Sequence, residues 1–279
     1  MVKKSTKINP KLRIVAAVSF VVMLVVNGIA GATTWLNGIN TGQVSDSFPN
    51  LFAPAGYTFG IWSVIYLLLA AYVVYQLNTK RRMGALLKQS TISAITPLFI
   101  ASSLINTVWI FAWQYQVMWL SAVLIIGLLV TLILINNRLR EQDFSPVERL
   151  IVKTPFSIYF GWITVATIAN IVTMLVSYSW DGFGMTDLFW MTAISIIGAL
   201  IGLVVMHRNR DCAYGAVFVW AYMGILVKHI SESGWNQEYP VVVGMLVALI
   251  SVLGAVTLYE LMRVIQVMQP DRTLDASRR

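Results

Sequence analysis

Charged residues, cysteine and histidine are all scarce in this sequence of 279 residues. Charged residues make up 11% of the chain, against about 25% in soluble domains, which excludes an ordinary soluble protein. The one cysteine, Cys212, excludes an intramolecular disulfide. Two histidines and scattered carboxylates give no metal-ligand spacing, no nucleophile beside a base and no phosphate loop. We therefore expect no catalytic residues and no metal site, which makes an enzyme the less favoured class.

Hydrophobic residues, in contrast, make up 58% of the chain, and the mean hydropathy is +0.73. A membrane-spanning helix needs about 20 consecutive apolar residues, and the sequence contains eight such runs. It therefore predicts an all-α fold, a polytopic integral membrane helix bundle with eight transmembrane helices. The predicted spans are Leu12–Thr33, Tyr57–Gln76, Ile92–Trp113, Val117–Ile135, Val152–Ser177, Leu188–Met206, Tyr214–Ile230 and Val241–Met262.

The positive charges fall almost entirely on alternate loops. Nineteen of the 20 lysines and arginines lie in the two tails and in the loops after the second, fourth and sixth spans. By the positive-inside rule, both termini are then cytoplasmic, and a bacterial cytoplasmic membrane is the simplest location. The net charge of +8 is explained by this topology, so the expected partner is the lipid bilayer and not nucleic acid.

The segment 48–75 joins a loop containing proline and glycine to an apolar helix that carries Trp62 and Tyr66. Pro49 and Pro54 oppose helix formation before this span, because proline lacks the N–H donor and restricts the preceding residue. Such a loop, folded over the mouth of a membrane helix, would form a lid over a pocket. The alternative is an aromatic belt at the membrane interface without any ligand.

Polar side chains recur at one depth in four predicted spans. At a rise of about 1.5 Å per residue, Asn27, Asn106, Asn170 and Trp62 all lie roughly 10 Å below the outer surface. Asparagine in a membrane span must find a polar partner, because lipid supplies none. These residues are therefore candidates either for a common ligand pocket or for hydrogen bonds between helices.

Local spacing supports a shared face on two of these helices. Asn106 and Trp109 are three residues apart, and Trp162, Ala166 and Asn170 follow one another at intervals of four. Residues at these spacings project from one side of a helix. The pattern predicts a pocket of aromatic rings with a few amides that orient an apolar ligand. Packed tryptophans and amide hydrogen bonds worth about 0.6 kcal/mol each explain the same pattern, so the residues alone leave both open.

Two charged pairs are suggested by spacing. Lys228, the one basic residue on the outer side, is followed one turn later by Glu232. It either pairs with Glu232 at the interface or supplies a counter-charge to an acidic ligand group. Glu260 and Arg263, three residues apart near the end of the last span, predict a local ion pair.

Three motifs together resemble a known family. They are PAGYTFGIWSVIY at Pro54–Tyr66, the pair Asn106 and Trp109, and GWITVATIAN at Gly161–Asn170. In this order, and on the second, third and fifth helices, they resemble the TspO/MBR family, the tryptophan-rich sensory proteins related to the mitochondrial translocator protein. The motif resemblance covers about Leu12–Ser177.

The resemblance implies a five-helix bundle, often dimeric, that binds tetrapyrroles, sterols and other hydrophobic ligands under its first loop. Some members are reported to promote porphyrin breakdown through tryptophan chemistry. The sequence departs from the family pattern at Tyr57, where the family usually has tryptophan. The expected ligand-binding residues are Tyr57, Trp62, Asn106, Trp109, Trp162, Ala166 and Asn170, with Asn27 and Lys228 as further candidates.

These observations divide the chain into a tail, 1–11, a five-helix bundle, 12–177, an additional three-helix segment, 178–264, and a second tail, 265–279. The expected function is binding or conveying a hydrophobic or amphipathic small ligand, tetrapyrrole-like by resemblance, in an aromatic pocket of the outer leaflet. The alternatives are a transporter of another small solute and a porphyrin-degrading enzyme. No cofactor is required; a porphyrin or haem would be the ligand. The resemblance also allows a homodimer, although the sequence itself does not fix the oligomeric state.

Overall fold

The computed structural model describes residues 9–78 and 86–268, and all regular structure within them is helical. Eight of the described helices are long and apolar enough to cross a membrane, which confirms the predicted number. The chain is thus a multi-pass integral membrane protein. The long helices are α1 (Pro10–Ala32), α3 (Ile61–Leu77), α4 (Gln89–Gln114), α5 (Met118–Arg140), α7 (Thr154–Ser177), α8 (Asp187–Asn209), α9 (Cys212–Ile230) and α10 (Pro240–Met268). Most of the predicted tails, 1–11 and 265–279, lies outside the described residues.

Short helical segments fill the connections between the long helices. The loop after α1 contains α2 (Thr41–Asp46) and the 3-10 turn η1 (Gly56–Gly60), which runs directly into α3. A capping box at Ser145 starts α6 (Pro146–Glu148), and a π-helical turn, η2 (Arg149–Lys153), continues it into α7. The turn η3 (Gly182–Gly184) lies between α7 and α8. The loop from Thr33 to Gly60 matters most for the candidate site, since it covers one end of the bundle.

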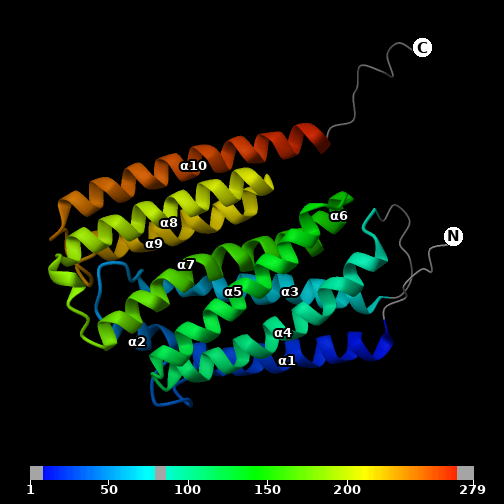
Figure 1. Ribbon diagram of the computed structural model, residues 1–279, viewed down its shortest axis with the longest axis horizontal. Helices are drawn as coiled ribbons and strands as arrows, with labels where there is room; N and C mark the ends of the chain where they lie inside the picture. Colours follow the sequence, from blue (N-terminus) through cyan, green and yellow to red (C-terminus); the bar gives the residue numbers. More distant parts are fainter. Residues whose placement is uncertain (1–8, 79–85, 269–279) are drawn as a thin grey trace, which may run out of the picture.

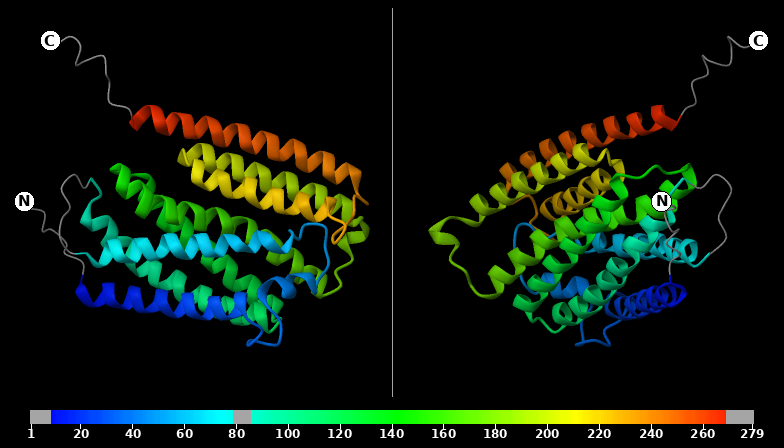
Figure 2. Two further views of the ribbon diagram at one scale, coloured as in Figure 1. Left: turned by 180° about the vertical axis from the view of Figure 1, so that it is seen from behind. Right: turned by 45° about the vertical axis from the view of Figure 1, so that its right-hand side comes forward.

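The long helices form two groups that pack against each other. Helices α1, α3, α4, α5 and α7 form one bundle, and α8, α9 and α10 lie along its side (Figure 1). Figure 2 shows the same arrangement from behind and at 45°. Of the three later helices, α9 makes the main contact with the bundle, through α7 and η1. The predicted boundary between residues 177 and 178 stays a prediction. Helix α9, which follows this boundary, packs closely against α7 and η1 of the five-helix bundle.

Glycines allow α9 to approach its neighbours. A Cβ atom added to Gly202 on α8 would lie 2.6 Å from the Phe218 ring of α9, and one added to Gly198 would lie 2.7 Å from the Tyr222 hydroxyl. On the other side, a Cβ added to Gly161 on α7 would lie 3.1 Å from the Tyr214 carbonyl oxygen. Small residues at such contacts are typical of membrane helices, which associate through close packing. Helix α9 is therefore wedged between α7 and α8.

Successive long helices run in opposite directions, so the loops gather at two ends of the molecule. We call one end the acidic end. Its described charged residues are Asp46, Asp181, Asp187, Glu232, Glu238 and a single cation, Lys228. We call the other the basic end, where the described cations include Arg138, Arg140, Arg149, Lys153, Arg208 and Arg210. Pro10 of α1 and Met268 of α10 both lie at the basic end.

One predicted ion pair is present and the other is wrong. Glu260 Oε1 lies 3.6 Å from Arg263 Nη1, and it also lies 3.1 Å from His207 Nδ1. Lys228 does not pair with Glu232: its Nζ lies 3.0 Å from Asp46 Oδ1, across the acidic end. Spacing along the chain predicted a pair with Glu232, the carboxylate nearer in sequence. The fold instead brings Asp46, in the loop after α1, next to the end of α9.

Candidate ligand-binding site

A cavity lies beneath the loop after α1, at the acidic end of the bundle. Its walls come from the loop, from α3, α4 and α7, and from α9. The cavity volume is about 40 Å³, enough for little more than a few water molecules. The lining residues are Thr41, Ser45, Asn50, Phe52, Ala53, Pro54, Phe59, Trp62, Trp109, Trp113, Trp162, Val165, Ala166, Ala169, Asn170, Thr173, Ala221 and Ile225.

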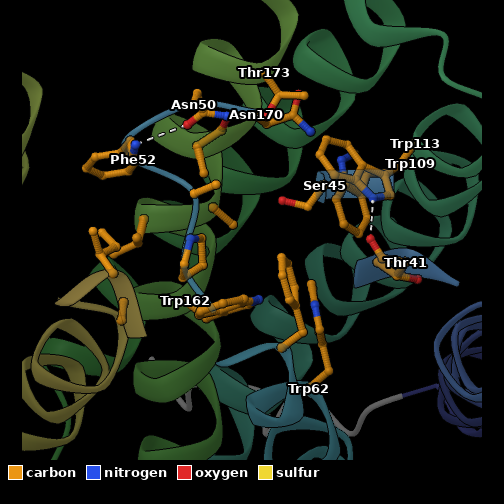
Figure 3. Close-up of a pocket in the computed structure, with 18 residues that line it drawn as sticks. Thr41, Ser45, Asn50, Phe52, Trp62, Trp109, Trp113, Trp162, Asn170 and Thr173 are labelled. Atoms are coloured by element: carbon orange, nitrogen blue, oxygen red, sulfur yellow. Dashed lines mark hydrogen bonds between the residues drawn. The ribbon is translucent and has the colours of Figure 1, made fainter. Parts of the chain in front are cut away.

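Aromatic rings pack around Trp62 on this cavity. The Trp62 ring centre lies 5.8 Å from that of Trp109 and 6.2 Å from that of Trp162, the second at a nearly perpendicular angle of 83°. Phe59 packs edge-on against Trp162 at 6.1 Å. Figure 3 shows Trp62 and Trp162 at one end of the cavity, Asn170 at the other, and Trp109 along one side. Two of these rings also stack on a neighbour, Trp62 on Tyr66 at 5.5 Å and Trp109 on Trp113 at 6.1 Å. Edge-on, tilted and offset-stacked contacts of this kind stabilise ring pairs.

Three polar atoms of residues that line the cavity are buried without a hydrogen-bond partner: Trp109 Nε1, Trp162 Nε1 and Asn170 Oδ1. The amide nitrogen of Asn170, in contrast, donates to Ser121 Oγ at 2.7 Å, which fixes the orientation of the side chain. Trp113 also has a partner, since its Nε1 donates to the Thr41 carbonyl at 3.2 Å. A buried polar group without a partner costs about 1–3 kcal/mol. Two unpartnered donors and one unpartnered acceptor therefore belong to residues that line the cavity.

Asn106 and Asn27, both predicted for the pocket, do not line the cavity. They hydrogen-bond to each other, with Asn27 Nδ2 donating to Asn106 Oδ1 at 2.8 Å. Asn106 Nδ2 in turn donates to the Tyr159 hydroxyl at 2.9 Å, and the Tyr159 ring lies 6.0 Å from that of Trp62. These contacts join α1, α4 and α7 one layer away from the cavity. The amides thus hold helices together, which is the alternative that the sequence left open.

Tyr57 and Lys228 also lie outside the cavity lining. The Tyr57 side chain is 49% exposed and packs edge-on against Trp220 of α9, with ring centres 5.5 Å apart. Lys228 is held by Asp46. Of the predicted residues, the cavity brings together Trp62, Trp109, Trp162, Ala166 and Asn170.

The start of the covering loop is anchored on the end of α4. Gln114 is fully buried, and its amide nitrogen donates to the carbonyls of Leu36 and Ile39. Asn37 Nδ2 donates in return to the Gln114 carbonyl at 2.8 Å. Short α2, which carries Thr41 and Ser45 into the cavity wall, follows directly. The position of α2 is therefore set by the buried polar contacts between Gln114 and the residues just before α2.

The end of the loop is anchored on α9. The Ala55 N–H donates to the Gly224 carbonyl at 3.0 Å, and Trp220 Nε1 donates to the Thr58 carbonyl at 3.0 Å. Nearer the acidic end, the buried His229 ring contributes a hydrogen bond between its Nε2 and the Leu51 carbonyl at 2.9 Å. Helix α9, from the region predicted as an additional segment, holds the cover of the cavity in place.

The sequence alone did not indicate which residues of the loop and of α9 line the cavity. Ala221 and Ile225 on α9 are small or apolar residues in an apolar helix, so no local pattern distinguishes them. Ala169 and Thr173 were detectable, because they lie three and seven residues after Ala166 on the same side of α7. Trp113 was detectable in the same way, one turn after Trp109.

Comparison with protein families identifies this chain. The family model described as TSPO-like protein matches residues 13–259, which is nearly the whole chain. The chain therefore belongs to the family of TSPO-like proteins. The match continues through α8, α9 and most of α10, well beyond the motif resemblance that ended at Ser177. Comparisons with curated proteins and with solved structures give no match.

Proposed function

We propose that this TSPO-like membrane protein binds a flat, amphipathic, tetrapyrrole-like molecule among the rings of Trp62, Trp109 and Trp162. The observation that carries the proposal is the set of three unpartnered polar atoms on a wall made of tryptophan rings. Ring faces bind a flat apolar ligand, and a few fixed polar groups orient it. Family membership and the motif resemblance support the same class of ligand.

The hydrogen-bonding roles of the three unpartnered atoms limit the class of ligand that fits. The Nε1 atoms of Trp109 and Trp162 need acceptors, while Asn170 Oδ1 needs a donor. A tetrapyrrole supplies both, through its carboxylate oxygens and its pyrrole N–H groups. A purely apolar ligand, such as a hydrocarbon, would leave all three groups unsatisfied and bind less tightly.

Binding requires the cavity to enlarge. Its volume of about 40 Å³ is far below the roughly 300 Å³ at which small-molecule pockets begin. The loop residues Asn50, Phe52 and Phe59 form its cover, so outward movement of the loop is the simplest way to admit a ligand. Conveyance through the membrane or degradation of the ligand would each begin from the same complex.

The test is quenching of tryptophan fluorescence by protoporphyrin IX, with the protein in lipid nanodiscs. We expect saturable quenching that is weakened about fivefold by Trp162→Phe, the loss of one net hydrogen bond of ~1 kcal/mol. The matched control is Trp119→Phe, because Trp119 is 54% exposed on α5 and does not line the cavity.

The control variant should retain the parent affinity. Linear quenching that is identical in the parent, Trp162→Phe and Trp119→Phe would mean that the porphyrin merely partitions into lipid, and it would refute the proposal.

A further inference from the structure

A second and larger cavity lies between α7 and α8. Its volume is about 350 Å³, within the range of small-molecule pockets. It shares only Asn50 and Phe52 with the first cavity, and Figure 3 shows the Phe52 ring pointing away from the tryptophans of that site. The lining residues are Pro49, Asn50, Leu51, Phe52, Ile168, Ile171, Val172, Leu175, Val176, Trp180, Asp181, Gly182, Asp187, Trp190, Met191 and Ile194.

The part of this cavity that lies farther from the acidic end of the molecule is apolar. On α7 it is lined from Val176 down to Ile168, eight residues or roughly 12 Å along the helix axis. On α8 the wall continues with Met191 and Ile194. An elongated apolar group can therefore lie parallel to the two helices.

The part of the cavity at the acidic end of the molecule, which we call its mouth, is aromatic and acidic. Trp180 and Trp190 pack against each other with ring centres 5.0 Å apart, and Trp190 Nε1 donates to the Gly182 carbonyl at 2.9 Å. Gly182 adopts a positive φ of 64°, and a Cβ there would lie 3.0 Å from Trp190 Nε1, so the turn depends on glycine. Asp181 and Asp187 line the same mouth and are both exposed.

Neither carboxylate has a cationic partner within the described chain. The one described cation of the acidic end, Lys228, is engaged by Asp46. The mouth therefore combines uncompensated negative charge with two indole rings, the groups that attract an ammonium through charge and cation–π contacts.

We propose that this cavity is a second binding site, for an amphipathic cation. Its ammonium group lies at Asp181, Asp187 and the Trp180–Trp190 pair, and its apolar tail lies between α7 and α8. A phospholipid fits less well, since its phosphate would approach the two carboxylates. The proposal does not rest on tetrapyrrole binding, because the tryptophans of the first site take no part in it.

Both aspartates also have local roles: Asp181 caps a turn, which does not require negative charge, and the charge of Asp187 adds a small stabilisation at the start of α8. Asp181 Oδ1 accepts from the Phe183 N–H at 3.0 Å, and Asp187 lies in the first turn of α8. Asparagine can make the same cap as aspartate, so Asp→Asn changes remove charge and retain the turn. Helix α8 also keeps its own cap, since Thr186 Oγ1 accepts from the Phe189 N–H.

The test is calorimetric titration of octyltrimethylammonium into the protein in nanodiscs, with protein-free nanodiscs as the blank. We expect saturable binding to the parent that is weakened roughly five- to tenfold in the double variant Asp181→Asn/Asp187→Asn. The matched control is Glu232→Gln/Glu238→Gln, which removes the same charge from exposed residues of the acidic end outside the cavity. This control and Trp162→Phe should each bind as the parent does.

Several results would overturn the proposal. Equal weakening in the two double variants would show a non-specific charge effect, and saturable binding of octyl sulfate with equal affinity would show that charge is irrelevant. Heats equal to those of protein-free nanodiscs would show that there is no site. Phosphatidylethanolamine that co-purifies with the parent but not with Asp181→Asn/Asp187→Asn would identify a lipid as the occupant instead.

Discussion

At the scale of single residues, the two buried asparagines of α4 and α7 have different roles. Asn106 uses its side-chain nitrogen and oxygen in hydrogen bonds to Tyr159 and Asn27, away from the cavity. Asn170 uses its nitrogen on Ser121 and leaves its oxygen unpartnered on the cavity wall. The first arrangement stabilises the helix bundle, whereas the second is available to a ligand.

This difference predicts opposite phenotypes for the two amides. Asn106→Leu should lower the free energy of unfolding by about 1–2 kcal/mol, because it removes two interhelical hydrogen bonds and leaves the Tyr159 hydroxyl without its donor. Its porphyrin affinity should change by less than about twofold. Asn170→Leu should weaken porphyrin binding more than it weakens the fold. Thermal unfolding and fluorescence titration of both variants measure the two effects, and a greater loss of affinity in Asn106→Leu would reverse the assignment.

The sequence predicted the level along the helix axis at which Asn27 and Asn106 lie, but not which way their side chains point. The regular rise of a helix places Asn27 and Asn106 at one level, and the structure confirms this through their hydrogen bond. Rotation about the helix axis depends on how neighbouring helices pack, and no single helix encodes it. The set Trp162, Ala166 and Asn170 was predicted correctly as a shared face because its members lie on one helix.

At the scale of elements, α9 and the loop after α1 act together. The loop reaches α9 through the hydrogen bond between Ala55 and Gly224 and through the bond between Thr58 and Trp220. Gly224 allows this approach, since a Cβ at that position would overlap the Thr58 side chain. The close contact of η1 with α9 therefore requires glycine.

Gly224→Ala should displace η1 and the loop from α9. We expect faster amide hydrogen exchange in residues 50–58 and a loss of roughly 1–3 kcal/mol in stability, as for other overpacked sites. Gly244→Ala on α10 is the control, because a Cβ there meets no atom within 4 Å. Hydrogen exchange measured by mass spectrometry compares the two variants, and unchanged exchange of residues 50–58 in Gly224→Ala would show that α9 does not hold the loop.

Sequence patterns predicted the helices but not the contact between α9 and the loop after α1. The predicted third span, Ile92–Trp113, agrees with α4 to within three residues, because apolar length alone sets such a span. The pairing of Lys228 with Asp46 joins residues 182 positions apart, and nothing local signals it. For the same reason the contribution of α9 to the cavity was missed.

At the scale of the whole molecule, the separation of charge predicts the orientation in the membrane. The basic end should face the cytoplasm and the acidic end the opposite side. In a Cys212→Ser background, Trp35→Cys, at a position 80% exposed in the loop after α1, should react with a membrane-impermeant maleimide in intact cells. Arg208→Cys at the basic end should react only after permeabilisation. The reverse pattern would invert the topology.

The central claim is that the cavity under the loop is the ligand site, and blocking it tests this claim most directly. Ala166→Phe places a ring between Trp162 and Asn170, in a cavity of only about 40 Å³. Ala248→Phe makes the same change at an exposed position of α10. We predict that saturable protoporphyrin IX quenching in nanodiscs is abolished in Ala166→Phe and retained in Ala248→Phe, with both proteins folded. Parent-like saturable binding in folded Ala166→Phe would contradict the claim.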